Sequence, residues 1–286
     1  MMHVTRSAGM VVEEGQVLPG RALPFAGACR WLISLDYDDT LRSNNPAHPV
    51  PVEFFELMQA WRGLGVRWGI NTGRTLPYLC EELLPHAPFL PDFICTCERY
   101  AYVAQEDGVL QPLREHNARC HEHNLMVRSR IRPVFHERLE MLRADNPALK
   151  WIIAPADPLS VEAEDSATMD AIMENLADFL HSLEGVTAQR AGRYMRLADA
   201  RYCKGTALQT VASLWGVPSD CLVLLGDGHN DLHAFRLFPK AFCGAPSTAH
   251  PDVLAYLQNC GGYISSTPGV MEILHAWQEL IMTERR

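Results

Sequence analysis

The sequence predicts an α/β protein whose main sheet is largely parallel. Short apolar runs alternate with helical stretches before residue 97 and again after residue 196, and this alternation is typical of parallel strands joined by helical crossovers. Acidic or polar residues directly follow several of the apolar runs, as they do at the carboxyl edge of such a sheet. Between the two alternating parts, residues 97–196 have the pattern of a separate α+β unit.

The first alternating part begins at an apolar run, residues 31–35, which leads directly into acidic residues. Such a run indicates a buried strand followed by a loop. Residues 51–64 carry apolar side chains at helical spacing, and Pro51 suits the first turn of a helix. The expected elements of this part are strands over 31–35, 66–70 and 93–96, and helices over 51–64 and 75–84.

The inserted part begins with a polar stretch that is rich in His and Arg and has helical spacing. Its expected elements are a helix over 116–143, strands over 149–154 and 159–163, a helix over 167–183, and strands over 186–190 and 193–198. Helix and strand patterns then alternate again. The elements expected after the insertion are a helix over 204–215, strands over 221–225, 240–245 and 261–266, and a helix over 269–284.

These patterns divide the chain into a core domain, an inserted domain and an extension. A chain of 286 residues can bury about three quarters of its unfolded surface, which allows one large domain or two. Residues 1–28 show no periodic pattern and are expected to be a loose extension. Residues 29–96 and 197–286 are expected to form the core domain, with residues 97–196 as the inserted domain.

The composition disfavours several classes of partner. Lys and Arg number 25 and Asp and Glu number 34, so the net charge is −9, and an acidic surface disfavours binding to nucleic acid. No apolar run approaches the length of a membrane span. The nine cysteines are scattered along the chain and no export signal is visible, so we expect a cytoplasmic protein. The sequence gives no indication of the oligomeric state.

Two acidic motifs are the main chemical signal in the sequence. DYDDT at 36–40 and GDGHND at 226–231 each follow an apolar run. Because the carboxyl ends of parallel strands share one edge of a sheet, both motifs and Thr72 can meet at one point. Carboxylates held close together repel each other, and a hard cation with oxygen ligands, such as Mg²⁺, relieves that repulsion. The motifs therefore predict a magnesium site.

Such a site could transfer a phosphoryl group. A carboxylate beside Mg²⁺ can attack phosphorus, because the metal neutralises charge on the nucleophile and on the phosphoryl oxygens. A second carboxylate can protonate the leaving alcohol and then activate water. The residues also have structural interpretations: Asp38 and Asp39 could cap turns, and Thr72 could be an ordinary hydroxyl at a strand end. For Arg74, a structural role and a role in the site are both open.

In their order along the chain, four motifs resemble those of the haloacid dehalogenase superfamily. They are DYDDT at 36–40, NTGR at 71–74, Lys204 in CKGTAL, and GDGHND at 226–231. The 131 residues between Thr72 and Lys204 are similar to the large cap of class IIB members, which are phosphatases of the Cof and sucrose-phosphatase kind. The resemblance covers the chain from about Trp31 onward, and it implies a Rossmann-like core with a parallel sheet plus an inserted α+β cap.

The resemblance also implies a role for each motif residue. Asp36 would be the nucleophile, and Asp38 would be the general acid and base. Mg²⁺ would be held by the side chains of Asp36 and Asp227 and by the backbone carbonyl of Asp38. The residues that would bind the phosphoryl group are Thr72, Gly73 and Lys204. Those that would support the metal or its waters are Asn230 and Asp231.

Two positions depart from the pattern of the family. Asp39 stands where many relatives have Gly, and residues 97–99 (CER) stand where many have an Asn-Gly pair. We expect the contacts that select the substrate to come from the cap. Glu98, Arg99 and Arg193 are the candidates, because they lie near the two crossings between core and cap in the sequence.

Together these features predict a Mg²⁺-dependent phosphatase that acts on a small phosphorylated metabolite, a sugar or polyol phosphate, through an aspartyl-phosphate. A mobile cap would close over the substrate and exclude water. Two alternatives remain open. One is a phosphotransferase or mutase, in which a second substrate hydroxyl replaces water; release of free phosphate without an acceptor would distinguish it from a hydrolase. The other is a binding protein that keeps the fold without catalysis.

Overall fold

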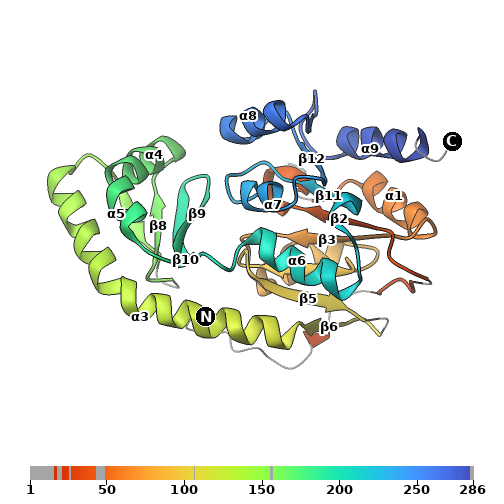
Figure 1. Ribbon diagram of the computed structural model, residues 1–286, viewed down its shortest axis with the longest axis horizontal. Coiled ribbons are helices and arrows are strands. Elements are labelled where there is room, and N and C mark those ends of the chain that lie inside the picture. Colours follow the sequence, from red (N-terminus) through yellow and green to blue (C-terminus); the bar gives the residue numbers. More distant parts are fainter. Residues whose placement is uncertain are drawn as a thin grey trace. The chain divides into compact units, whose positions relative to one another are not determined.

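The computed structural model describes residues 16–17, 21–25, 27–42, 49–105, 107–154 and 157–283. These residues form two compact units (Figure 1). We call residues 118–202 the inserted unit, and the described residues up to Asn117 and from Cys203 onward the core unit. In the described part of the chain, no helix combines the length and the hydrophobicity that a membrane span requires.

The core unit is built on one mixed sheet. Its strands are β1 (Gln16–Val17), β2 (Trp31–Leu35), β3 (Val66–Asn71), β4 (Phe93–Thr96), β5 (Tyr100–Ala104), β6 (Val109–Pro112), β11 (Leu222–Leu225), β12 (Phe242–Ala245) and β13 (Tyr263–Ile264). Their spatial order is β1-β6-β5-β4-β3-β2-β11-β12-β13. The run from β4 to β13 is parallel, whereas β5, β6 and β1 add to it antiparallel. The predicted α/β class with a parallel main sheet is confirmed.

Helices cover both faces of this sheet (Figure 1). They are α1 (Val52–Arg62), α2 (Leu76–Glu82), α6 (Lys204–Leu214), α7 (Leu232–Leu237), α8 (Pro251–Cys260) and α9 (Met271–Thr283). Ile33 on β2 belongs to one apolar cluster, together with Trp61 of α1 and Trp277 of α9. Its neighbour Leu32 belongs to a second cluster with Leu208 of α6. Successive side chains of a strand point to opposite faces, so β2 is buried on both sides, as its mostly apolar sequence predicts.

The inserted unit has its own antiparallel sheet. Its elements are most of α3 (Arg114–Asp145), β7 (Trp151–Ile153), β8 (Ser160–Ala163), α4 (Ser166–Asn175), α5 (Ala177–Ser182), β9 (Val186–Ala191) and β10 (Tyr194–Asp199). The strand order is β7-β8-β10-β9. Val161 and Met195 on one face of the sheet pack with Phe135 of α3 and Ile172 of α4. This is the α+β unit that the change of pattern predicts, although the expected helix over 167–183 is divided at Leu176 into α4 and α5.

The chain passes from one unit to the other at different residues from those that the sequence predicts. The sequence places the first boundary at residue 97, whereas the structure divides the chain between Asn117 and Ala118. The reason is the hairpin of β5 and β6, which pairs with β4 and so extends the core sheet. The second boundary lies after Tyr202 instead of at residue 196, because β10 pairs with β9 as far as Asp199.

The described part of the expected loose extension is packed on the core unit. Residues 16–17 form β1 on the edge of the sheet. The carbonyl of Arg21 accepts a hydrogen bond of 3.0 Å from the backbone of Leu90. The Phe25 ring lies 4.0 Å from the guanidinium of Arg67, which holds residues 21–25 by a cation–π contact. Residues 1–15, 18–20 and 26 lie outside the described residues.

Candidate active site

The predicted site residues of the core lie at the carboxyl edge of its sheet. β2 is flanked by β3 and β11, so the loops after these three strands are neighbours. The Asp36 backbone N–H donates to the Leu225 carbonyl over 2.8 Å, and the Thr72 N–H donates to the Cys95 carbonyl over 2.9 Å. The first residue of each loop is therefore hydrogen-bonded to the end of an adjacent strand, which fixes the position of that residue.

Three carboxylates gather at this edge. One oxygen from each of Asp36, Asp227 and Asp231 lies within 4.8 Å of the others. The Thr40 hydroxyl donates to Asp227 Oδ1 over 2.7 Å, which orients that carboxylate. A Cβ on Gly226 would lie 2.1 Å from Cγ of Asp231, so only glycine leaves room for the Asp231 carboxylate. The GDGHND loop is therefore shaped by packing as well as by its charges.

Lys204 supplies the cation of this cluster. Its side chain is 1% exposed, and its Nζ lies 2.7 Å from Asp231 Oδ1 and 2.9 Å from Asp36 Oδ1. The side-chain amide of Asn71 donates to the Lys204 carbonyl over 2.9 Å, so the first turn of α6 is held against the end of β3. Burial alone would lower the pKa of Lys204, but Asp231 and Asp36 together raise it above its ordinary value. The ammonium is therefore charged at neutral pH.

One ammonium does not balance three carboxylates. Burial raises the pKa of Asp36 well above 3.8; Lys204 opposes that shift, and Asp231 and Asp227 add to it. Burial, and then repulsion by Asp231, raise the pKa of Asp227 to about 6. A buried excess of negative charge with oxygen donors fits a hard divalent cation such as Mg²⁺. Within the described residues, Asn230 Oδ1 is also buried without a hydrogen-bond partner. This amide oxygen, in the residue next to Asp231, is available to coordinate a metal ion or its waters.

Asp38 lies in the same loop as Asp36 but has different partners. Its carboxylate accepts from Arg74 Nε over 2.6 Å and from Arg74 Nη2 over 3.2 Å, and Arg42 lies 3.4 Å away. The next residue, Asp39, has a φ of +54°. That left-handed conformation favours Gly but is accessible to Asp, which explains how Asp39 can replace the glycine of many relatives.

The turn between β4 and β5 brings Glu98 into the site. Cys97 and Glu98 have φ values of +51° and +64°, and the Arg99 N–H donates to the Thr96 carbonyl over 3.0 Å. A two-residue turn of this kind normally has Asn-Gly, so these side chains are held in an unfavourable conformation. Glu98 is 3% exposed, and its Oε1 accepts from Asn230 Nδ2 over 3.1 Å. The turn thus connects β4 to the GDGHND loop.

The structure separates the three predicted specificity residues. Glu98 contacts the acidic loop through Asn230. Arg99 is buried in the core unit, where its carbonyl accepts from His116 Nε2 over 2.7 Å. Arg193 belongs to the inserted unit, between β9 and β10, and its Nη2 lies 2.8 Å from Glu162. Glu98 therefore lies beside the acidic loops of the core unit, whereas Arg193 belongs to the inserted unit.

Sequence reasoning missed two residues that shape the site, Thr40 and Asn71. Both lie inside the quoted motifs. Thr40 lies in the loop that follows β2 and Asn71 is the last residue of β3, and these positions are the available signal. Thr40 bonds Asp227, which is 187 residues away, and Asn71 bonds the Lys204 carbonyl, 133 residues away. Neither partner could be assigned from a pattern along the chain.

A parallel core sheet, carboxylates and a buried lysine at its carboxyl edge, and an inserted α+β unit together define the class of this protein. That class is the haloacid dehalogenase-like hydrolases. A sequence model of the haloacid dehalogenase-like hydrolases matches residues 92–274, or 183 of the 286 residues. The chain belongs to this family, and its two-unit architecture is that of class IIB. The match begins after Asp36 and Thr72, which the fold itself brings to the site.

Solved structures show the same fold. The chain is similar to the sucrose-phosphatase of Synechocystis sp. PCC6803, determined with sucrose and phosphate, with a TM-score of 0.64, 20% identity, and coverage of 88% of this chain and 98% of that chain. It is also similar to the haloacid dehalogenase-like hydrolase yhjK of Bacillus subtilis, with a TM-score of 0.56, 13% identity, and coverage of 93% and 95%. At sequence identities of 20% and 13%, these similarities show that the chain shares the fold of the two proteins. Among curated protein sequences, none matches this chain.

Proposed function

We propose that the protein is a Mg²⁺-dependent phosphatase that hydrolyses a small phosphate monoester through an aspartyl-phosphate on Asp36. The observation that carries this proposal is the cluster of Asp36, Asp227 and Asp231, in which Asp36 and Asp231 contact the buried Lys204 ammonium. A phosphoryl group is a dianion, and transferring it requires a nucleophile and positive charge at the same point. The cluster supplies the nucleophile and one fixed cation, and its excess of carboxylates provides for a second cation.

Asp36 is the proposed nucleophile because its two oxygens differ. Oδ1 accepts from the Tyr37 N–H over 2.8 Å and lies 2.9 Å from Lys204. Among the described residues, Oδ2 has no such partner, so it is the oxygen that we assign to the attack on phosphorus. Fixing one oxygen orients the other, and orientation of this kind lowers the barrier of a displacement.

Asp38 is the proposed general acid and base. Its carboxylate would protonate the oxygen of the leaving alcohol and later take a proton from the attacking water. In the described structure Arg74 holds it through two hydrogen bonds. We propose that Arg74 keeps Asp38 at the site and that the Asp38 side chain turns toward the leaving oxygen when substrate binds. This assigns Arg74 a positioning role.

The residues proposed to hold Mg²⁺ are Asp36 and Asp227 through their side chains and Asp38 through its backbone carbonyl. Asn230 and Asp231 would support the ion or its waters. When bound, Mg²⁺ would neutralise charge on the carboxylates and on the phosphoryl oxygens. The residues proposed to bind the phosphoryl group are Thr72, Gly73 and Lys204.

The proposed substrate class is a sugar or polyol phosphate. The likeness to the sucrose-phosphatase whose structure holds sucrose and phosphate supports this choice. Glu98, Arg99 and Arg193 remain the proposed specificity residues. Because Glu98 already bonds Asn230, its first proposed effect is to hold the metal-binding loop in place.

Phosphate release from a panel of sugar and polyol phosphates, in Mg²⁺ and without an acceptor alcohol, tests the proposal. Asp36→Asn should abolish release, because an amide cannot form the aspartyl-phosphate. Asp39→Asn is the matched control: it removes one exposed carboxylate from the same loop, and Asn also tolerates a positive φ. The proposal fails if Asp36→Asn retains activity within about tenfold of the control, or if no substrate releases phosphate.

Asp38→Asn tests the acid–base assignment separately. Loss of a general acid typically costs about 10²–10⁴ in rate, and the loss should be largest for a poor leaving group. Activity on a sugar phosphate should therefore fall much further than activity on p-nitrophenyl phosphate, whose phenolate needs no proton. Equal losses on the two substrates would contradict the assignment of Asp38.

A further inference from the structure

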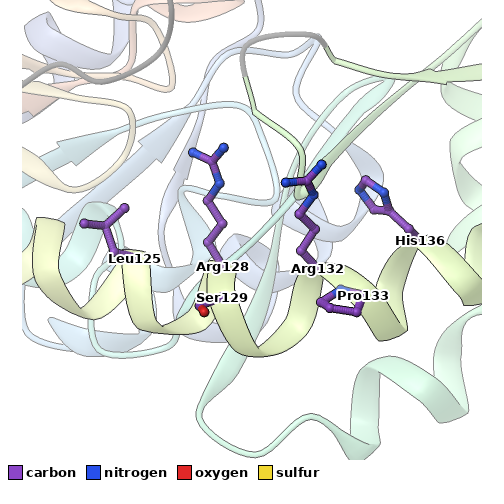
Figure 2. Close-up of a pocket in the computed structure, with 6 residues that line it drawn as sticks. All are labelled: Leu125, Arg128, Ser129, Arg132, Pro133 and His136. Carbon is purple, nitrogen blue, oxygen red and sulfur yellow. The ribbon is translucent and has the colours of Figure 1, made fainter.

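A hollow of about 510 Å³ lies along α3 on the inserted unit (Figure 2). Its lining residues are Leu125, Arg128, Ser129, Arg132, Pro133 and His136. Its volume is in the range of small-molecule sites, which is about 300–1,000 Å³. None of the lining residues is acidic. The hollow is therefore a basic surface on a chain whose net charge is −9.

The arginines of this stretch of α3 lie on two sides of its buried stripe. Ile131 belongs to that stripe and packs in the apolar core of the inserted unit. Arg130 lies on one side and donates to the Glu184 carbonyl over 2.8 Å. Arg128 and Arg132 lie on the other side, four residues and thus about one helical turn apart. Figure 2 shows both of these side chains extending from the same side of the helix.

Arg128 and Arg132 differ from the other arginines of the inserted unit in having no partner among the described residues. Arg190 pairs with Asp170, Arg201 pairs with Asp199, and Arg193 pairs with Glu162. Like charges one helical turn apart repel each other and destabilise a helix. An anion bound between the two guanidinium groups would remove this repulsion.

The hollow also offers a hydrogen-bond acceptor. Pro133 lies inside α3 and has no N–H, so the Ser129 carbonyl lacks its usual donor one turn further along the helix. His136 closes the row, and its Nε2 lies 2.7 Å from the Pro158 carbonyl, which fixes the ring. Two arginines without a partner among the described residues, beside a carbonyl that lacks its helical donor, suit a ligand that has both an acidic group and a hydroxyl.

We propose that this hollow binds a small hydroxylated organic acid through a carboxylate or phosphate group held by Arg128 and Arg132. A guanidinium presents parallel N–H donors that match the two oxygens of such a group. The acid could be a second acidic group on the phosphatase substrate or a separate metabolite, because the chemistry that recognises it is the same. Binding can be measured without turnover, so the proposal stands apart from the proposed catalytic function.

Protection of arginine from phenylglyoxal, followed by peptide mass spectrometry, tests the binding. The probes are glycerate, which has a carboxylate, glycerol 3-phosphate, which has a phosphate, and glycerol, which is neutral. Asp36→Asn in Mg²⁺ is the protein used, since it should not consume the phosphate ester. We expect glycerate or glycerol 3-phosphate to slow labelling of Arg128 and Arg132 by about tenfold, the effect of one or two charge-assisted hydrogen bonds, and glycerol to have no effect. Arg130 is the internal control.

Kinetics then distinguish the two sources of the acid. The double variant Arg128→Gln/Arg132→Gln is compared with Arg130→Gln on two substrates, 3-phosphoglycerate and glycerol 3-phosphate. The first has a carboxylate where the second has a hydroxymethyl group. If kcat/KM falls by about tenfold or more for 3-phosphoglycerate alone, the hollow recognises the substrate. If both substrates are unaffected while glycerate still protects the arginines, the hollow binds a separate metabolite. Thermal unfolding confirms that the variants are folded.

The proposal is overturned if neither acid protects Arg128 and Arg132. It is also overturned if Arg130 is protected to the same extent, because the effect would then be general screening of positive charge. Both results remain meaningful if the protein has no phosphatase activity, since the labelling experiment requires only that the chain is folded.

Discussion

Replacing Asp227 by Asn should stabilise the metal-free protein at neutral pH while removing a proposed metal ligand. Asn has the same shape, and its carbonyl oxygen can still accept the 2.7 Å hydrogen bond of Thr40. What changes is the charge. The pKa of Asp227 is raised from 3.8 to about 6 by burial and by Asp231, so the folded state opposes ionisation of this carboxyl group.

The sign and size of the effect follow from that shift. Between pH 3.8 and about 6 the folded protein binds more protons at Asp227 than the unfolded chain does, so this group lowers stability as the pH rises through that window. The difference of 2.2 pKa units, 6 minus 3.8, corresponds to about 3 kcal/mol at neutral pH. Asp227→Asn should recover up to that amount above about pH 6.5 and almost none near pH 4, where the wild-type carboxyl is protonated.

Urea unfolding in EDTA, followed by tryptophan fluorescence across this pH range, measures the effect. Five of the six tryptophans lie in the core unit, so the signal reports the unit that contains Asp227. Asp220→Asn, at an exposed carboxylate of the same unit, is the control and should change little. An Asp227→Asn variant that is no more stable than wild type at neutral pH, or equally stabilised near pH 4, would refute the reasoning.

Three further predictions concern the same cluster. Lys204→Met should lower the free energy of unfolding by about 3–5 kcal/mol at neutral pH, measured by urea in EDTA, because it leaves two buried carboxylates without their cation; an unchanged midpoint would contradict this. Gly226→Ala should destabilise the protein by about 1–3 kcal/mol, because its Cβ overlaps Asp231, whereas Gly63→Ala, whose Cβ has its nearest neighbour at 4.0 Å, should be nearly neutral. EDTA should abolish phosphate release and Mg²⁺ should restore it, with Ca²⁺ a poor substitute because its larger shell favours another carboxylate geometry; full activity in EDTA would exclude the proposed metal.

The parallel core could be predicted from the sequence because burial on both faces leaves short runs that are mostly apolar in β2 and entirely apolar in β11. The hairpin of β5 and β6 could not. The turn that leads into it from β4 uses Cys97 and Glu98 at positive φ, where the pattern that predicts a turn is Asn-Gly. Without that signal, the sequence pattern indicates no strands over residues 100–112 and places these residues in the inserted domain. The Cys97 N–H donates to the Arg74 carbonyl and the Glu98 N–H donates to the Thr72 carbonyl, each over 2.9 Å. These bonds and the contact of Glu98 with Asn230 stabilise a turn that its own residues disfavour.

The site could be predicted to the level of the motif loops. Asp36, Thr72 and Asp227 each follow a strand, and the topology of a parallel sheet brings such residues to one edge. The contacts between side chains of different loops could not be predicted. The contact of Asp38 with Arg74 and that of Glu98 with Asn230 join separate loops, and their geometry depends on rotamers that no spacing along the chain determines.

The burial of Lys204 makes it a natural reporter of local opening. The chain has three lysines, at positions 150, 204 and 240. Lys150 and Lys240 are exposed, whereas the Lys204 ammonium is enclosed between two carboxylates. An acylating reagent therefore modifies the first two in the folded state and reaches Lys204 only when this part of the molecule opens. The rate at which Lys204 is acylated measures how often the site opens, and a peptide mass spectrum can record it in the absence of any substrate.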